Sequence, residues 1–216
     1  IFMPPWQMPQ EAGRCWEEDG VTLRYTSLGS QPFSTSRSLL EDVLAWQPQI
    51  IHSFKPKAYS GLAMWWLWQF HRQKFRLVVD MDDWEGPGGW NDLAPYTAVQ
   101  KRFFTWQEQW GMSHAHALTV ASRTLEGIVW SNGIAVEQVH YLPNGSGLPD
   151  DAPGITTGQI EARRYELGLG SRPTLLLYSR FFEFETERLA EILGGVKERV
   201  PDLALLFIGE CLYDKD

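Results

Sequence analysis

Cysteine is scarce in this chain of 216 residues, and long apolar runs are absent. Its two cysteines, Cys15 and Cys211, lie far apart in the sequence. They provide neither a disulfide framework nor the close spacing of a metal site, so we expect ordinary thiols in a reducing, cytoplasmic compartment. The longest apolar run, residues 61–68, is shorter than the ~20 residues that a membrane-spanning helix needs. The sequence therefore predicts no membrane span.

Basic side chains are also in short supply. The chain has 19 Lys and Arg against 27 Asp and Glu, which gives a net charge of -8. Proteins that bind the phosphate backbone of nucleic acids use clusters of Lys and Arg. We therefore expect no nucleic-acid partner. The chain begins at Ile1 without the basic and apolar segments of a signal peptide, which indicates a start inside a longer protein.

Apolar and aromatic residues are plentiful. The chain is 44% apolar and has 11 tryptophans, several of them within residues 65–68. This composition supports a substantial core, where we expect most of the tryptophans to lie. The alternative for some of them is a bilayer interface, which favours amphipathic aromatic rings. Peripheral contact with the inner face of a membrane therefore stays open.

The apolar pattern switches repeatedly between the period of a strand and that of a helix. Strands are predicted at 1–3, 21–26, 50–53, 77–79, 117–121, 139–142, 175–178 and 203–208. Helices are predicted at 38–47, 59–74, 95–111, 122–133, 159–167 and 186–200, with Ser38 and Glu41 as a capping box and Thr186 as a cap. This alternation is typical of βαβ units. The predicted fold class is α/β, with Rossmann-like parallel sheets.

A segment rich in Pro, Gly, Asp and Thr divides the chain. We predict a first domain over residues 1–145 that lacks its first strand, a linker over 146–158, and the beginning of a second domain over 159–216. Both domains are expected to be Rossmann-like and incomplete at the outer ends of the chain.

Polar side chains follow several predicted strands. Ligands of open parallel sheets bind beyond the carboxyl ends of the strands, so these residues are site candidates. They are His52 and Ser53; Asp80, Asp82, Asp83 and Trp84; Asn144 and Gly145; and Arg180. Carboxylates accept hydrogen bonds from sugar hydroxyls, and one can act as a general base. The acidic and aromatic group from Asp80 to Trp84 therefore suits a carbohydrate, although a solvated acidic turn or a divalent-metal site remains open.

Three segments, in their order along the chain, resemble the retaining glycosyltransferase family four, whose members have the GT-B fold. Residues 47–53 (QPQIIHS) are similar to the family's segment that ends in His. Residues 115–122 (AHALTVAS) resemble its strand that ends in Ser, and residues 139–145 (VHYLPNG) match its Pro-Asn-Gly domain junction. The resemblance covers about residues 47–209 and implies an acceptor-side domain followed by the start of a donor-side domain.

The resemblance also implies a function and site roles. A hexose would pass, with retention, from a nucleotide diphosphate sugar to a glycan, a lipid or another hydroxyl acceptor, without a cofactor or an obligatory metal. Arg180 would contact the donor diphosphate, Gly209 would lie near the nucleotide, and Asn144 and Gly145 would complete the donor site. Asp82 matches best the position where many members carry a functional His, so it is the predicted catalytic residue. His52, Ser53, Asp80, Asp83 and Trp84 would bind the acceptor and the reacting sugar.

The sequence departs from the family at two donor-side positions. Glu185 stands where the family commonly has a Lys, and Cys211 replaces a Gly. With the missing outer segments, these departures predict that the chain by itself does not turn over. One alternative is a metal-dependent GT-A transferase that reads Asp80 and Asp82 as its Asp-x-Asp motif. Another is a non-catalytic module that binds carbohydrate or lipid.

Overall fold

The computed structural model describes residues 1–29, 31–145, 153–181 and 185–209. The chain divides into two compact units, Ile1–Ser146 and Gly147–Asp216. Most of the expected linker, residues 146–152, lies outside the described residues, as does Cys211.

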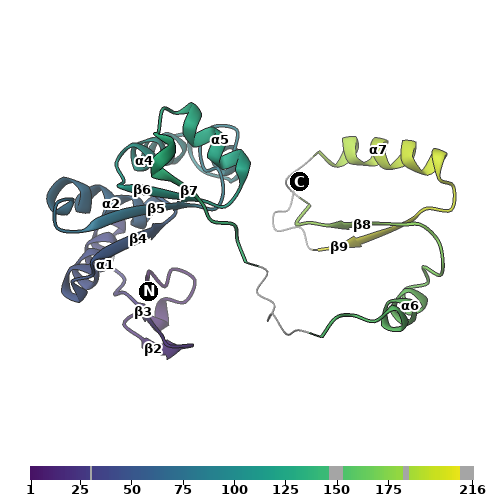
Figure 1. Cartoon of the computed structure of the whole chain (residues 1–216), viewed down its shortest axis with the longest axis horizontal. Coiled ribbons are helices and arrows are strands. Elements are labelled where there is room, and N and C mark those ends of the chain that lie inside the picture. Colours follow the sequence, from purple (N-terminus) through teal and green to yellow (C-terminus); the bar gives the residue numbers. More distant parts are fainter. Residues whose placement is uncertain (30, 146–152, 182–184, 210–216) are drawn as a thin grey trace. The chain divides into compact units, whose positions relative to one another are not determined.

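A four-stranded parallel sheet forms the centre of the first unit (Figure 1). Its strands run in the order β4 (Ile50–Phe54), β5 (Arg76–Met81), β6 (Ala117–Val120) and β7 (Val139–Tyr141). β5 lies between two neighbours, and its Leu77, Val79 and Met81 are buried. The register pairs Asp80 of β5 with Phe54 of β4 and with Thr119 of β6. The carboxyl ends of these three strands therefore meet at one edge of the sheet.

Helices alternate with these strands, as expected for βαβ units. They are α1 (Pro32–Trp46), α2 (Ala58–His71), the short α3 (Trp90–Leu93), α4 (Ala98–Ser113) and α5 (Arg123–Ser131). Helices α1, α2, α4 and α5 each contribute side chains to the apolar core around the sheet. The buried members of that core are Leu40, Met64, Leu67, Phe75, Leu77, Val79, Met81, Met112, Ala115, Leu118, Val120, Leu125, Val129 and Val139.

The start of α1 corrects one expectation. The capping box predicted at Ser38 and Glu41 is wrong, because both residues lie inside the helix. The helix begins at Pro32, where the fixed φ of proline suits a first turn. Ser34 Oγ donates to the carbonyl of Gln31 and accepts from its N–H. The side-chain cap therefore sits about two turns before the predicted one.

A small sheet precedes α1. It consists of β1 (Phe2–Met3), β2 (Cys15–Glu18) and β3 (Val21–Tyr25), in the order β1-β3-β2. The pattern-based reading missed β2, because Cys-Trp-Glu-Glu does not alternate. Single 3-10 turns lie at η1 (Pro9–Glu11) and η2 (Val136–Gln138). Within the described residues, no helix is both long enough and apolar enough to cross a membrane.

The second unit contains α6 (Thr157–Glu166), β8 (Thr174–Tyr178), α7 (Thr186–Arg199) and β9 (Ala204–Ile208). β8 and β9 pair in parallel, and α7 connects them, so this is one βαβ unit. Thr186 is the first residue of α7 rather than its cap, which is Glu185. Helix α6 begins at Thr157, with the side chain of Thr156 accepting from the N–H of Gln159.

Candidate functional site

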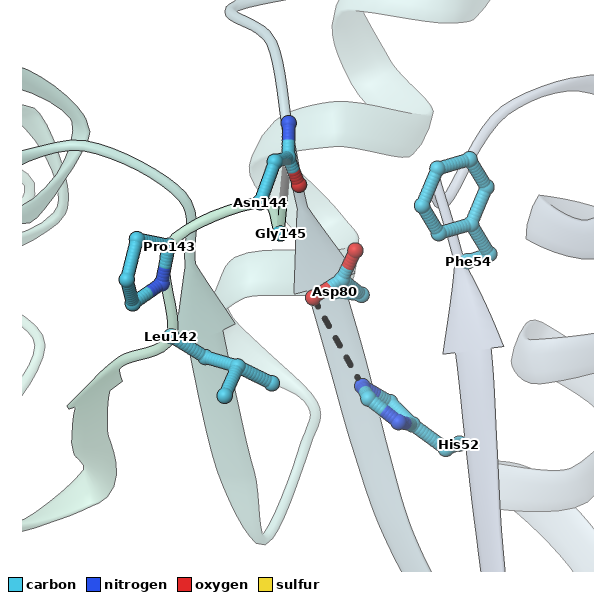
Figure 2. A pocket seen from close by; sticks show the side chains of 7 residues that line it. All are labelled: His52, Phe54, Asp80, Leu142, Pro143, Asn144 and Gly145. Atoms are coloured by element: carbon cyan, nitrogen blue, oxygen red, sulfur yellow. Dashed lines mark ion pairs between the residues drawn. The ribbon is translucent and has the colours of Figure 1, made fainter. Parts of the chain in front are cut away.

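A cavity of about 400 Å³ opens at the carboxyl edge of the four-stranded sheet (Figure 2). Its walls come from the ends of β4, β5 and β7 and from the segment that follows β7. The lining residues are His52, Phe54, Asp80, Leu142, Pro143, Asn144 and Gly145. The structure thus brings together four of the residues predicted from separate segments of the sequence: His52, Asp80, Asn144 and Gly145.

A hydroxyl connects the two ionisable groups of this cavity. Thr119 Oγ1 donates to Asp80 Oδ1 and lies 2.9 Å from His52 Nε2. Because the single Thr119 proton is given to Asp80, the hydroxyl accepts from an Nε2–H of His52. His52 Nε2 is also 3.7 Å from Asp80 Oδ1. The Asp80 side chain is 14% exposed and that of His52 is 45% exposed, so the imidazole is the more accessible group.

Ser53 lies differently from its neighbour. It is buried within β4, where it pairs with Val79 of β5, and it is not part of the cavity lining. Successive side chains of a strand point to opposite faces, so His52 and Ser53 do not share one surface. Their adjacency in sequence does not make them partners in a site.

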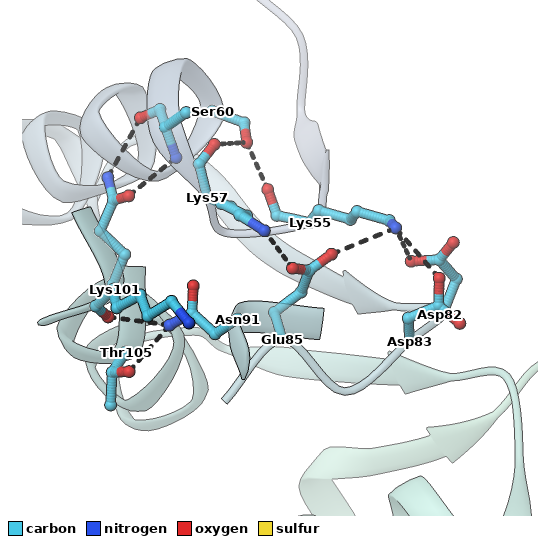
Figure 3. A network of polar contacts seen from close by, with 11 residues as sticks. Lys55, Lys57, Ser60, Asp82, Asp83, Glu85, Asn91, Lys101 and Thr105 are labelled. Carbon is cyan, nitrogen blue, oxygen red and sulfur yellow. Dashed lines mark hydrogen bonds and ion pairs between the residues drawn. The ribbon is translucent and has the colours of Figure 1, made fainter. Parts of the chain in front are cut away.

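A second polar cluster lies beyond the end of β5 and centres on Lys55 (Figure 3). Lys55 Nζ lies 3.3 Å from Asp82 Oδ1, 3.2 Å from Asp83 Oδ2 and 3.3 Å from Glu85 Oε1. The backbone of Lys55 has a left-handed φ of 53°, and the hydroxyl of Ser60 donates to its carbonyl. A single ammonium group thus gathers Asp82 and Asp83 of the segment predicted to bind sugar, together with Glu85 directly after it.

Lys57 extends this cluster towards α4. Its Nζ forms an ion pair with Glu85 Oε2 and lies 4.6 Å from the centroid of the Tyr96 ring and 5.1 Å from that of Phe104. The Glu85 side chain is only 6% exposed. A buried carboxylate is costly without a paired cation, so Glu85 depends on the two lysines to stay charged. Lys55 and Lys57 therefore have carboxylate partners in this structure.

The cluster changes the proton affinity of its members. Burial raises the pKa of the Asp82 carboxyl; Lys55 opposes that change, and the neighbouring Asp83 charge adds to it. Burial lowers the pKa of Lys55, but the charges of Asp82, Glu85 and Asp83 outweigh it, so that pKa is raised. A carboxylate with raised proton affinity suits a general base, and Asp82 is the predicted catalytic residue, a role that stays a prediction.

Glu108 of α4 is a buried carboxyl behind this cluster. It is 1% exposed, and neither of its side-chain oxygens has a hydrogen-bond partner within the described residues. Burial, together with the charge of Glu85, raises the pKa of Glu108 to about 8. Glu108 is therefore protonated at neutral pH.

The neighbouring Gln107 donates to and accepts from the backbone of Ala58, which joins α4 to the start of α2.

Trp84 packs within its own loop. Its indole N–H donates to the carbonyl of Pro87 at 2.8 Å, and it packs against the hydrophobic core. A Cβ added to Gly86 would lie 2.3 Å from the Trp84 ring, and one added to Gly89 would lie 2.1 Å from the Trp84 carbonyl oxygen. These glycines let the loop close over the indole. Part of the ring that was predicted to stack on a sugar is thus covered by protein.

The remaining predicted residues lie in the second unit. Arg180 follows β8, and Gly209 follows β9. Gly209 has a φ of 139°, and an added Cβ would lie 1.8 Å from the carbonyl oxygen of Ser179, so no other residue fits there. The carboxyl ends of β8 and β9 therefore approach each other closely. The donor-binding roles of Arg180 and Gly209 stay predictions.

Sequence reasoning missed three polar residues of these sites. Thr119 is the one polar residue of β6, and its parallel register with Asp80 was its signal. The sequence carries no signal that Lys55 and Glu85 contact each other. Only the fold shows that their charges pair across 30 residues of sequence.

Asp80 and Asp82 do not act as a pair in this structure. Asp80 accepts from Thr119 within the cavity, whereas Asp82 faces Lys55. Within the described residues, no group of three or more His, Cys, Asp or Glu side chains is arranged to hold a metal ion. The structure thus gives no direct support to a metal-binding Asp-x-Asp motif formed by Asp80 and Asp82.

The parallel sheets, with a cavity at the carboxyl edge of the larger one, and the Pro-Asn-Gly segment after β7 are those of a Rossmann-like protein of the GT-B type. Residues 5–145 match the family described as "Glycosyl transferase 4-like domain", and the chain belongs to that family. The match covers the whole cavity. No curated protein matches the chain.

One solved structure supports the fold, and two others show a weaker similarity. The chain is similar to Anabaena HepE, solved in complex with UDP and glucose, with a TM-score of 0.58 and 14% sequence identity over 90% of this chain and 49% of that chain. A glycosyltransferase from Rickettsia africae gives a TM-score of 0.45 and 11% identity over 86% of this chain and 55% of that one. The S. aureus MnaA–UDP structure gives a TM-score of 0.44 and 13% sequence identity over 85% of this chain and 47% of that one. This chain thus spans about half the length of these proteins.

Proposed function

We propose that the protein transfers a hexose from a nucleotide diphosphate sugar to a hydroxyl group of a glycan or lipid-linked acceptor, with retention of configuration and without a cofactor. The observation that carries this proposal is the cavity in which His52, Asp80 and Asn144 meet. A volume of about 400 Å³ lies in the range of small-ligand sites. An imidazole, a carboxylate and a carboxamide together offer donors and acceptors for sugar hydroxyls.

Family membership supports glycosyl transfer, and the chemistry of the cavity supports a sugar as the bound group. HepE, which shares the fold, was solved with UDP and glucose. In the proposed reaction His52 and Asp80 orient the reacting sugar, and Asp82 and Asp83 bind the acceptor hydroxyl. In the second unit, Arg180 stabilises the charge of the leaving diphosphate.

The proposal is tested by screening nucleotide sugars for thermal stabilisation of the full-length protein and then measuring its donor hydrolysis and transfer. We expect His52→Gln and Asn144→Ala to reduce the thermal stabilisation that the nucleotide sugar produces, since both residues line the cavity. His71→Gln is the control, because His71 ends α2 and is absent from the cavity lining. If the nucleotide sugar stabilised all three variants equally, the cavity would not be its binding site.

Arg180 is tested separately. Arg180→Ala should lower the rate of donor hydrolysis by about 10²–10³-fold, as removal of one transition-state donor does elsewhere. An unchanged rate would show that the diphosphate is stabilised by other groups. Inverted configuration in the product, read by NMR, would overturn retention while leaving glycosyl transfer intact.

A further inference from the structure

The cavity at the carboxyl edge of the four-stranded sheet has two apolar walls. Phe54, the last residue of β4, forms one of them and is 61% exposed. Leu142 and Pro143, which follow β7, form the other. Figure 2 shows Asp80 between these two walls. The cavity therefore presents an aromatic ring and a carboxylate side by side.

Strand pairing fixes these positions. Phe54 pairs with Asp80 of β5, and Asp80 pairs with Thr119 of β6, so the three side chains form one row on the same face of the sheet. The N–H of Leu142 donates to the carbonyl of Val120 at 3.0 Å, which attaches the opposite wall to the end of β6. Both walls thus come from the sheet itself, and a ligand can enter with little reordering of the backbone.

The polar floor of the cavity suits hydroxyl groups and not anions. Asp80 accepts from Thr119, and His52 donates its Nε2–H to the same hydroxyl. The other ring nitrogen of this His52 tautomer is an acceptor, as is the second oxygen of Asp80. Among the described residues that line the cavity, none is a Lys or an Arg. The floor therefore accepts hydrogen bonds from a ligand and has no permanent cation to offer it.

The basic side chain beside the aromatic wall is already paired. Lys55 Nζ lies 6.0 Å from the centroid of the Phe54 ring. Its carboxylate partners are Asp82, Asp83 and Glu85. These three carboxylates outnumber the two lysines that pair with them. The surroundings of the cavity therefore add negative charge to that of Asp80.

We propose that the cavity selects an uncharged pyranose over a hexuronic acid and that the sugar stacks on Phe54, an inference that rests on the function proposed above. A pyranose has hydroxyls around its edge and C–H groups on both faces. One face packs on the Phe54 ring while hydroxyls at the edge donate to Asp80 and His52. The carboxylate of a hexuronic acid would be repelled by Asp80, with no cation in the lining to offset it. Phe54 is thus a specificity-determining residue.

Binding of simple sugars to the full-length protein tests this proposal. The probes are the methyl glycosides of glucose, galactose and mannose and of the three corresponding uronic acids, titrated by saturation-transfer NMR. We expect a neutral glycoside to bind with saturation of its ring C–H protons, and its uronic acid to bind at least about tenfold more weakly. Asp80→Asn keeps the shape of the side chain and removes its charge, so it should narrow that difference.

Phe54→Leu should weaken binding of the neutral glycoside by about 2–10-fold, because the aromatic face is lost. Phe54→Tyr keeps the ring and should bind like the unchanged protein. Phe70→Leu is the matched control, since Phe70 is also 61% exposed but lies on α2 and is not part of the cavity lining. Thermal unfolding shows that each variant is folded.

Three results would overturn the inference: no binding of any neutral glycoside, equal binding of a neutral glycoside and its uronic acid, or equal effects of Phe54→Leu and Phe70→Leu. The probes carry no nucleotide, so their binding is measured independently of transfer. Transfer from nucleotide sugars without the expected discrimination would refute this inference alone. Absence of transfer together with the expected binding would refute the proposed function alone.

Discussion

Thr119 Oγ1 lies 2.9 Å from His52 Nε2, although 67 residues separate them in sequence. The contact arises because β4 and β6 both flank β5 and present their polar residues at the same edge of the sheet. Thr119 is therefore a positioning residue, which holds the imidazole in its Nε2–H form.

Thr119→Val should remove the hydrogen bond that fixes the tautomer of His52, with little change of side-chain volume. We expect a loss of about tenfold in kcat/KM for donor turnover, since one hydrogen bond in the site is lost. Imidazole ¹⁵N NMR of the unliganded protein should show the Nε2–H tautomer of His52 in the parent and a mixture in the variant. Thr119→Ser keeps the hydroxyl and should restore both properties; failure of that rescue would contradict the assignment.

Lys55→Gln should destabilise the fold by about 1–3 kcal/mol, because it leaves three carboxylates without their shared cation. Urea denaturation measures the difference. Arg37→Gln is the matched control, since the side chains of its ion pair with Glu41 are 79% and 61% exposed. We expect a change below about 1 kcal/mol there. Equal effects of the two substitutions would mean that the Lys55 cluster contributes no more than a surface ion pair.

Glu108→Gln should stabilise the protein increasingly as the pH rises from about 5 to about 8. The pKa of Glu108 is about 8 in the folded protein, above its usual value of 4.5. Between these values the unfolded chain has released the proton and the folded protein still holds it, so the parent loses stability as pH rises. Below pH 4.5 both states are protonated, and the parent and the variant should be equally stable.

The expected gain at high pH is on the order of a few kcal/mol, measured by urea denaturation of the parent and the variant across this pH range. Glu137→Gln, which removes an exposed carboxylate, is the control for a general change in charge. A difference between the Glu108 variant and the parent that stays constant with pH would show that the carboxyl is not held protonated.

Gly61→Ala should cost about 1–3 kcal/mol, because the new Cβ would lie 2.5 Å from Gln107 Nε2 and 2.7 Å from the carbonyl oxygen of Pro56. Gly127→Ala is the control within α5, where no atom lies within 4 Å of the added Cβ. There we expect a gain of roughly 0.5–1 kcal/mol from helix propensity. Thermal unfolding of both variants distinguishes crowding from propensity.

The sequence pattern predicted the strands of the parallel sheet well, because short apolar segments such as residues 77–79 mark them. The pattern led to β5 over 77–79, and the structure extends it through Asp80 to Met81. It failed for β2, whose Cys-Trp-Glu-Glu is formed by pairing with β3 rather than by its own preference. The start of α1 was misplaced because Gln31 and Ser34 form an unusual cap.

The site was predictable where it depends on strand ends. His52 and Asp80 lie near the carboxyl ends of β4 and β5, and Asn144 follows β7 of the same parallel sheet, so their proximity follows from topology. The pairing of Lys55 with Asp82, Asp83 and Glu85 was not predictable, since it needs the loop after β5 to fold back past the end of β4. Burial of Glu108 was hidden too, because a Glu among polar residues of a helix resembles a solvated position.

The Gln107 side chain accepts from the N–H of Ala58 at 2.7 Å and donates to its carbonyl at 3.1 Å. Both backbone polar groups of Ala58, the first residue of α2, are thus hydrogen-bonded to a side-chain carboxamide of α4. Solvent exchange of the Ala58 amide proton then requires α4 to move away, however stable α2 is by itself. The start of α2 and the middle of α4 should consequently open to deuterium together, as one cooperative element.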